Sequence, residues 1–357
     1  MADIKITPGE LNDPAVDEII NLEKSLARAT GKFVDDIPTP LYLNPIFYYA
    51  VAALVAGLMA WGVEEPFYSD DPRKGTHIPF LSDYVFFGPV AALIGLAVGL
   101  AYGISNRNVK QMFYCGVVGV GVGLLATLLT TFVADMVYGI TSTTAQGFMT
   151  RDQVGPDGML HLRGFAFFVQ MCGRGVAWSI VSLGGGLGLG VALKSRQLFL
   201  NGIAGSMIGG LLGGLMFDPV HRFILNWGPE ASLSRAIGIA AIGLLVGIFI
   251  GLFENISKEA WFQMLRGALA GKQFILFKSP MMIGSAPKCD IYLFKDSAIE
   301  PRHASVAKRG GKYLIQDQGT PGGTFVNGRK VDRHILQPND IVSIGETVLK
   351  YHERQKR

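Results

Sequence analysis

The side chains best suited to catalysis or metal binding are few in this sequence and stand apart from one another. No cysteine belongs to a CxxC pair, and no histidine lies at zinc-ligand spacing from a cysteine. No nucleophile–base pair, facing carboxylate pair or cofactor loop has a recognisable context. We therefore predict reduced structural cysteines, no metal, no cofactor and no enzymatic activity. The residues concerned are Cys115, Cys172, Cys289, His77, His161 and His221.

A more specific set of polar residues lies in the C-terminal part, within short alternating strands separated by turn signals. Gly310-Gly311 and Asn327-Gly328 are typical of hairpin turns. Eight or more short strands from Gln273 onward predict an antiparallel β-sandwich. The motifs on these strands and their loops are Ile283-Gly284, Cys289-Asp290-Ile291-Tyr292-Leu293, Pro301-Arg302-His303-Ala304, Gly323-Thr324-Phe325-Val326-Asn327-Gly328, Leu336-Gln337-Pro338-Asn339-Asp340-Ile341 and Ile344-Gly345.

These ordered motifs, over about residues 262–353, resemble the forkhead-associated (FHA) domains. The resemblance implies an 11-stranded sandwich whose loops at one end read a phosphothreonine in an extended peptide. The family pattern has a Gly-Arg pair, a Ser-x-x-His and an Asn-Gly. It implies scaffold roles for Gly284, His303 and Gly328, and a hold on the peptide backbone for Asn327.

Two positions depart from the family pattern, and both fall on its phosphate contacts. Ser285 stands where the family has arginine, so the bidentate charge-assisted pair is lost. Glu300 stands where the family has serine, and its carboxylate would repel phosphate. We predict that phosphothreonine recognition is weakened or lost and that a protein partner is bound without it. The candidate partner-binding residues are Ser285, Lys288, Glu300, Arg302, Thr324 and Asn327.

The elements that carry this domain are apolar runs close to the roughly 20 residues that cross a bilayer. They occur at about 45–63, 84–104, 112–134, 173–193, 198–217 and 234–253. Arg174 is the one ionisable residue near a run and is expected to snorkel to the interface. The short apolar segment from Phe165 to Met171 either lies at the interface or extends the fourth run. The fold class is therefore a glycine-rich all-α membrane bundle of about six spans plus a C-terminal all-β FHA-like sandwich.

Composition supports this division and excludes a single soluble domain. Residues 84–253 carry only 9 basic and 5 acidic residues and 31 of the 46 glycines. Residues 1–83 carry 6 basic and 13 acidic residues, and residues 254–357 carry 17 and 10. We expect a cytoplasmic N-terminal segment at 1–44, a six-span bundle at 45–253, a linker at 254–261 and the FHA-like domain at 262–357. A short amphipathic helix is predicted after Asp13-Pro14, and no signal peptide is expected.

Basic residues in the short loops predict the orientation. The two tight linkers, 105–111 and 194–197, hold Arg107, Lys110, Lys194 and Arg196 and no acid. The alternate connections are longer and richer in Asp and Glu. The positive-inside rule places the tight linkers, and with six spans both termini, in the cytoplasm. A bacterial inner membrane is the predicted location.

The glycines recur every fourth residue, which places them on one helix face and favours close packing in lipid. A glycine-striped span, a basic turn and a second glycine-striped span occur at 95–135 and again at 186–218, and the sixth span resembles the first half of that unit. Either duplication or low-complexity apolar sequence explains the likeness. The predicted packing glycines are Gly95, Gly99, Gly103, Gly205, Gly209, Gly213, Gly243, Gly247 and Gly251.

Three functions follow from these features. The first is a membrane-anchored adaptor that presents the FHA-like domain to a cytoplasmic protein partner. The second is a subunit of a larger membrane assembly that uses its glycine faces against other membrane subunits. The alternative is a channel or transporter regulated by the C-terminal domain. The predicted partners are a protein and the lipid bilayer, and no nucleic acid.

Overall fold

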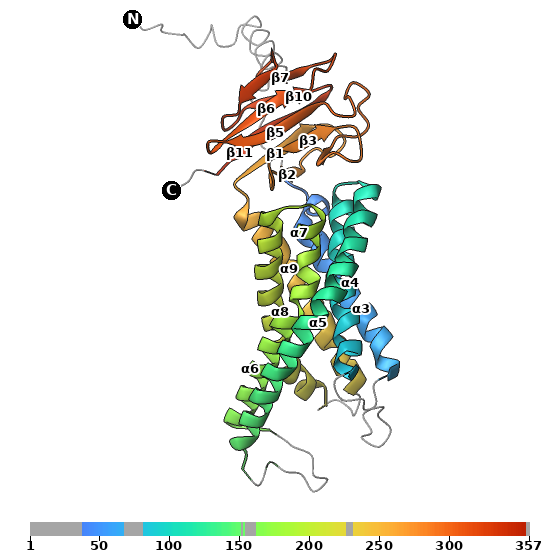
Figure 1. The fold of residues 1–357 in the computed structure, drawn as a ribbon, viewed down its shortest axis with the longest axis vertical. Coiled ribbons are helices and arrows are strands. Elements are labelled where there is room, and N and C mark those ends of the chain that lie inside the picture. Colours follow the sequence, from blue (N-terminus) through green and yellow to red (C-terminus); the bar gives the residue numbers. More distant parts are fainter. Residues whose placement is uncertain (1–37, 68–80, 151–152, 154–161, 226–230, 355–357) are drawn as a thin grey trace, which may run out of the picture. The chain divides into compact units, whose positions relative to one another are not determined.

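The computed structural model describes residues 38–67, 81–150, 153, 162–225 and 231–354, and the chain divides into two compact units. Residues 44–258 form a helical bundle, and residues 1–43 and 259–357 form the second unit. The predicted N-terminal helix, His77 and His161 lie outside the described residues. Figure 1 shows the helices of the bundle and the strands of the second unit.

Six helical segments of the bundle are long and apolar enough to cross a membrane, as the sequence predicts. The third segment is the longest, because α5 runs for 39 residues. The apolar segment from Phe165 to Met171 extends the fourth segment, since α6 begins at Gly164. The helices are α3 (Pro45–Glu64), α4 (Leu81–Ser105), α5 (Val109–Gly147), α6 (Gly164–Val181), α7 (Leu183–Ala192), α8 (Arg196–Leu225) and α9 (Ala231–Ser257), with short 3-10 helices η1 (Leu41–Leu43) and η2 (Glu65–Phe67).

Side-chain caps set where two of these helices begin. The Asn44 side chain accepts a hydrogen bond from the Ile46 N–H, and Pro45 occupies the first turn of α3. Asn108 caps α5 in the same way by accepting from the Gln111 N–H.

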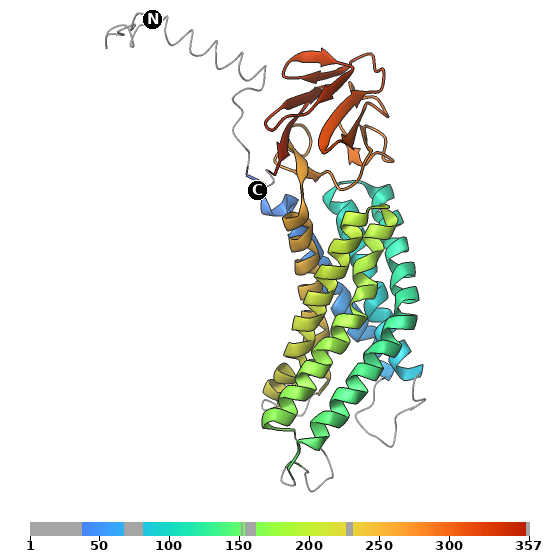
Figure 2. The same ribbon diagram turned by 60° about the vertical axis from the view of Figure 1, so that its left-hand side comes forward.

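At the other end of α5, the helix continues past the roughly 20 residues that a bilayer needs. There α5 runs beside α6 beyond the ends of its neighbours (Figures 1 and 2).

All nine predicted packing glycines stand where another helix approaches too closely for a side chain. A Cβ at any of these positions would lie less than 3.0 Å from an atom of the neighbouring helix. At Gly95, for example, it would lie 2.5 Å from the Gly119 carbonyl oxygen. Such approach increases the van der Waals contact that holds helices together in lipid.

Arg174 has polar partners that the sequence did not indicate. Its Nε lies 2.9 Å from Asp218 Oδ1, and its Nη2 donates to the Tyr138 hydroxyl at 2.8 Å. Side chains from α5, α6 and α8 thus meet in one polar cluster. The sequence could not show this, because Asp218 lies 44 residues from Arg174, just after the fifth apolar run.

The C-terminal unit is an all-β sandwich of two sheets in its described part (Figure 2). The larger sheet has the order β2-β1-β11-β10-β7-β8 and the smaller sheet β4-β3-β5-β6-β9. The eleven strands are β1 (Ala260–Arg266), β2 (Gln273–Ile275), β3 (Met281–Gly284), β4 (Ile291–Tyr292), β5 (Ala304–Arg309), β6 (Lys312–Asp317), β7 (Thr324–Val326), β8 (Arg329–Val331), β9 (Arg333–Ile335), β10 (Ile341–Ile344) and β11 (Thr347–Glu353).

Alternation along these strands places their apolar side chains between the sheets. Phe262, Ile283, Ile315, Val342 and Tyr351 are each completely buried or nearly so. Between the two units, α9 ends at Ser257 and β1 begins at Ala260. Most of the linker expected at 254–261 is therefore helix or strand.

Candidate functional site

The β3–β4 and β4–β5 loops meet at Gly284, next to the residues that the sequence assigns to partner binding. A Cβ at Gly284 would stand 2.4 Å from the Pro301 carbonyl oxygen, so only glycine allows this approach. The Ser285 N–H donates to the Glu300 carbonyl at 3.0 Å. The structure thus brings the two positions that depart from the family pattern together.

The Ser285 hydroxyl forms a hydrogen bond that joins the β3–β4 loop to the β4–β5 loop. The Oγ donates to the Ile299 carbonyl at 2.7 Å, and the residue is only partly exposed. The Glu300 side chain, in contrast, is exposed. A ligand at this surface therefore meets the Glu300 carboxylate. The neighbouring Ser285 hydroxyl already donates its hydrogen bond within the domain.

His303 connects the loops behind this surface. It is completely buried, and its Nδ1 accepts from the Glu300 N–H at 3.1 Å. Its Nε2 lies 3.2 Å from the Gly323 carbonyl and 3.1 Å from Thr320 Oγ1. These contacts are those of a scaffold residue, which ties the β4–β5 loop to the β6–β7 loop.

Thr324 and Asn327 use polar side-chain atoms for hydrogen bonds inside the domain. Thr324 is fully buried and donates to Asp317 Oδ1 at 2.7 Å. The Asn327 amide donates to Asp340 Oδ1 at 2.8 Å and accepts from the Ile341 N–H at 3.0 Å. Asn327 and Gly328 also have positive φ values of 50° and 77°, as a two-residue hairpin turn between β7 and β8 requires.

Exposed basic side chains lie on or next to the loops that hold Ser285 and Glu300. Lys288 and Arg302, both predicted from sequence, are exposed on the β3–β4 and β4–β5 loops. Lys330 on β8 is a third that the sequence analysis missed. A Cβ at Gly323 would lie 2.9 Å from its Nζ, so the ammonium group lies against the β6–β7 loop. No sequence signal marks Lys330, since it becomes a neighbour only through the β7–β8 hairpin.

Asp317 fixes the β6–β7 loop. Its carboxylate accepts from the Thr320 and Thr324 hydroxyls and from the Gly319 and Thr320 N–H groups, all at 2.7 to 2.9 Å. Burial raises the pKa of Asp317, but the four donors outweigh that effect and hold the pKa below its usual value. A carboxylate that stays charged thus orders the loop on which Gly323 and Thr320 meet His303.

Cys289 is protected rather than reactive. It is buried within the β3–β4 loop, where its Sγ lies 3.1 Å from the Pro301 carbonyl. Burial raises the pKa of the thiol above its usual value, so little thiolate forms at neutral pH. Among the described residues, no three His, Cys, Asp or Glu side chains are grouped as metal ligands would be.

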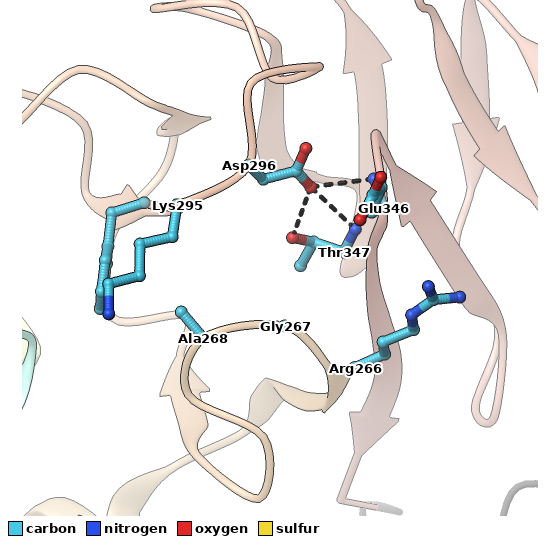
Figure 3. A pocket seen from close by; sticks show the side chains of 8 residues that line it. Arg266, Gly267, Ala268, Lys295, Asp296, Glu346 and Thr347 are labelled. Carbon is cyan, nitrogen blue, oxygen red and sulfur yellow. Dashed lines mark hydrogen bonds between the residues drawn. The ribbon is translucent and has the colours of Figure 1, made fainter.

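An open pocket of about 200 Å³ lies elsewhere on the domain, between the β1–β2 loop, the β4–β5 loop and the β10–β11 turn. Figure 3 shows Lys295 and Arg266 on opposite sides of it. Asp296 Oδ2 accepts from the Glu346 N–H, the Thr347 N–H and the Thr347 hydroxyl, at 2.9 to 3.0 Å. Its carboxylate thus stabilises the turn, and none of the six predicted partner-binding residues lines the pocket.

Comparison with known proteins agrees with this geometry. A family model described as the inner membrane component of T3SS, cytoplasmic domain (Yop-YscD) matches residues 263–355. Over 90 residues the chain is 36% identical to the glycogen accumulation regulator GarA of Mycolicibacterium smegmatis. Over 125 residues it is 27% identical to the FHA domain-containing protein FhaB of Mycobacterium tuberculosis. The C-terminal part of this chain is an FHA domain.

These relatives match only a minor part of this chain. The match covers 25% of this chain and 56% of GarA, or 35% of this chain and 77% of FhaB, so the chain spans about half the length of the first of these relatives. Among solved structures, the FHA domain of CT664 from Chlamydia trachomatis is 29% identical, with a TM-score of 0.25. That match covers 28% of this chain and all of the solved one.

Proposed function

We propose that this protein is a membrane-anchored interaction protein whose FHA domain binds a protein partner at the cytoplasmic face without the phosphothreonine contacts of its family. The observation that carries the proposal is the pair formed by Ser285 and Glu300. Ser285 is too short to form a bidentate contact with phosphate, and its hydroxyl donates to Ile299. Glu300 is exposed where a phosphate would have to approach.

Charge favours an unphosphorylated partner segment. A phosphothreonine carries about 1.5 to 2 negative charges at neutral pH and would be repelled by the Glu300 carboxylate. Lys288, Arg302 and Lys330 remain available around the loops for ordinary carboxylate or carbonyl groups. A partner segment with both acceptors and a basic group for Glu300 fits this surface better than a phosphorylated one.

The bundle supports an anchoring or assembly role. The two short turns of the bundle carry Arg107 and Lys194, and basic residues in short loops favour the cytoplasm. The family model that matches the FHA domain describes an inner membrane component, which agrees with a chain that joins such a domain to six apolar helices. Other membrane subunits are therefore candidate partners. A channel or transporter remains the alternative, tested by solute flux in reconstituted vesicles.

Binding of matched peptide pools to the full-length protein in mild detergent tests the proposal. We expect the wild-type protein to bind the phosphorylated and unphosphorylated pools equally well. Proteins that co-purify with it from membranes should likewise bind without a preference for phosphothreonine. The double variant Ser285→Arg with Glu300→Ser should gain such a preference, because it restores both family contacts. A control with the same change in charge, Gln337→Arg with Glu346→Ser, alters exposed residues at other turns.

Two results would overturn the proposal. One is a wild-type protein that binds a phosphothreonine peptide at least about tenfold more tightly than its unphosphorylated form, a difference of about 1.4 kcal/mol. The other is the absence of any co-purifying protein together with no binding from either pool. The first result rejects phosphate independence, and the second rejects the adaptor role.

A further inference from the structure

Two helical hairpins of the bundle pack with the same register. In the first hairpin, α4 and α5, a Cβ at Gly103 would lie 2.2 Å from Met112 Cα, and one at Gly123 would lie 2.7 Å from the Ala91 carbonyl. In the second hairpin, α6–α7 and α8, a Cβ at Gly190 would lie 2.4 Å from Phe199 Cα, and one at Gly210 would lie 2.6 Å from the Trp178 carbonyl. Gly190, Phe199, Gly210 and Trp178 correspond to Gly103, Met112, Gly123 and Ala91. Each residue of the second hairpin lies the same number of positions after its counterpart in the first.

The turns of these two hairpins are also alike. Arg107 and Lys194 occupy equivalent positions with positive φ values of 52° and 51°. Asn108 and Ser195 follow them, and their side chains accept from the Gln111 and Leu198 N–H groups. Their own N–H groups donate to the Gly103 and Gly190 carbonyls at 2.9 and 3.0 Å. Low-complexity sequence alone does not produce a shared turn and a shared packing register.

The last and first helices form a third pair with this register. A Cβ at Gly251 on α9 would lie 2.8 Å from Ile46 Cα on α3, and one at Gly57 would lie 2.7 Å from the Ile239 carbonyl. Gly251 therefore corresponds to Gly103, and Gly57 to Gly123. The third unit has no turn, since the chain leaves α9 at Ser257 to form the FHA domain. Its two helices come from opposite ends of the membrane region.

An ion pair recurs at one position of this unit. Arg235 on α9 holds Glu65 through two hydrogen bonds, of 3.0 Å from Nε and 2.6 Å from Nη2. The shared register equates Arg235 with Arg174, and Glu65 with Asp218, which form the pair described above. Both pairs are mostly buried, with exposed side-chain fractions of 11 to 27%. Each joins the two helices of one unit, and in the second hairpin the pair lies at the end opposite the turn.

The first hairpin has no charges at this position. The corresponding residues are Phe87 on α4 and Thr131 on α5. Thr131 is completely buried, and its hydroxyl has no hydrogen-bond partner among the described residues. An unsatisfied polar atom thus stands where the other two units place a carboxylate.

We propose that the bundle consists of three copies of one two-helix unit, and that the arginine–carboxylate pair fastens the two helices of a unit at its open end. The unit of α9 and α3 depends most on this fastening, because no turn joins its helices. Glu65–Arg235 therefore joins the first membrane helix to the last. In the unit of α4 and α5, the uncharged residues Phe87 and Thr131 occupy the positions of this pair.

Double-mutant cycles on the full-length protein in mild detergent test the fastening. We expect Arg235→Gln and Glu65→Gln each to lower the unfolding midpoint by about 5 °C or more, since removing one partner leaves a buried charge. The double variant should be no less stable than the worse single variant. Arg174→Gln with Asp218→Asn should show the same coupling with smaller shifts, because the turn at 193–195 remains.

Transplanting the pair tests the three-copy inference. We expect Phe87→Arg and Thr131→Glu to destabilise the protein singly and to compensate each other when combined. The control combines Thr131→Glu with Phe86→Arg, one position out of register, and should show no compensation. Independent effects at residues 65 and 235 would overturn the fastening. Failure of the transplanted pair to compensate, or equal compensation in the control, would overturn the equivalence of the units.

Discussion

Single polar side chains determine how the loops of the FHA domain are held. Asp317 receives four hydrogen bonds, and His303 joins the β4–β5 loop to the β6–β7 loop. The sequence motifs located these loops and the substitutions at Ser285 and Glu300. They could not show that Thr324 and Asn327 are used internally, because a motif names a side chain without naming its hydrogen-bond partner.

The acid sensitivity of the domain is predicted to depend on Asp317. Its folded-state pKa is lowered, so its contribution is present above the unfolded-state value of about 4 and is lost as the pH falls through the folded-state pKa. We expect Asp317→Asn to destabilise residues 259–357 by about 1 to 2 kcal/mol at pH 7. Thermal unfolding from pH 7 to pH 3 should show the two curves converging in acid. The exposed Asp332→Asn serves as the control, and a difference that stays constant with pH would contradict the prediction.

At the scale of elements, the apolar runs predicted six helices and the turn signals predicted the strands. Helix lengths were less accessible, because α5 continues through Thr141, Thr143 and Thr144, whose hydroxyls donate to carbonyls of the preceding turn. Glycine spacing indicated faces of close approach but could not assign their partners. Gly95 faces Gly119, whereas Gly243 faces Ala53 on a helix distant in sequence.

Substitutions on α5 distinguish packing glycines from lipid-facing ones. A Cβ at Gly119 would lie 2.2 Å from the Gly95 carbonyl, whereas Gly121 has nothing within 4 Å. We expect Gly119→Leu to separate α4 from α5 and to reduce the yield of monodisperse protein several-fold. Gly121→Leu should behave like the wild type. Size-exclusion chromatography in mild detergent measures both, and equal behaviour of the two variants would show that close approach at Gly119 is dispensable.

At the scale of the whole molecule, composition predicted a membrane bundle and a soluble domain, but not which helices meet. Glu65 and Arg235 are 170 residues apart, and no pattern in the sequence links them. Orientation remains a prediction, based on the basic residues of the two short turns.

Labelling of introduced cysteines tests the orientation. In a cysteine-free protein, a single cysteine replaces either Asn106 in the first turn or the exposed Thr144 near the far end of α5. We expect a membrane-impermeant maleimide added to intact cells to label only the variant at residue 144. Permeabilised cells, in which both variants should react, provide the control. Labelling at residue 106 in intact cells would reverse the assigned orientation.

The pairing of α3 with α9 has a consequence for synthesis. The first membrane helix emerges from the ribosome long before the last, so it must wait in the bilayer while four further spans are inserted. Its glycine-matched face and the Glu65 carboxylate lack their α9 contacts until that helix arrives, and translation of the FHA domain follows within a few residues. A chain interrupted before residue 231 would leave that face exposed to quality-control proteases. Completion of the membrane domain and the start of the FHA domain are thus nearly simultaneous events.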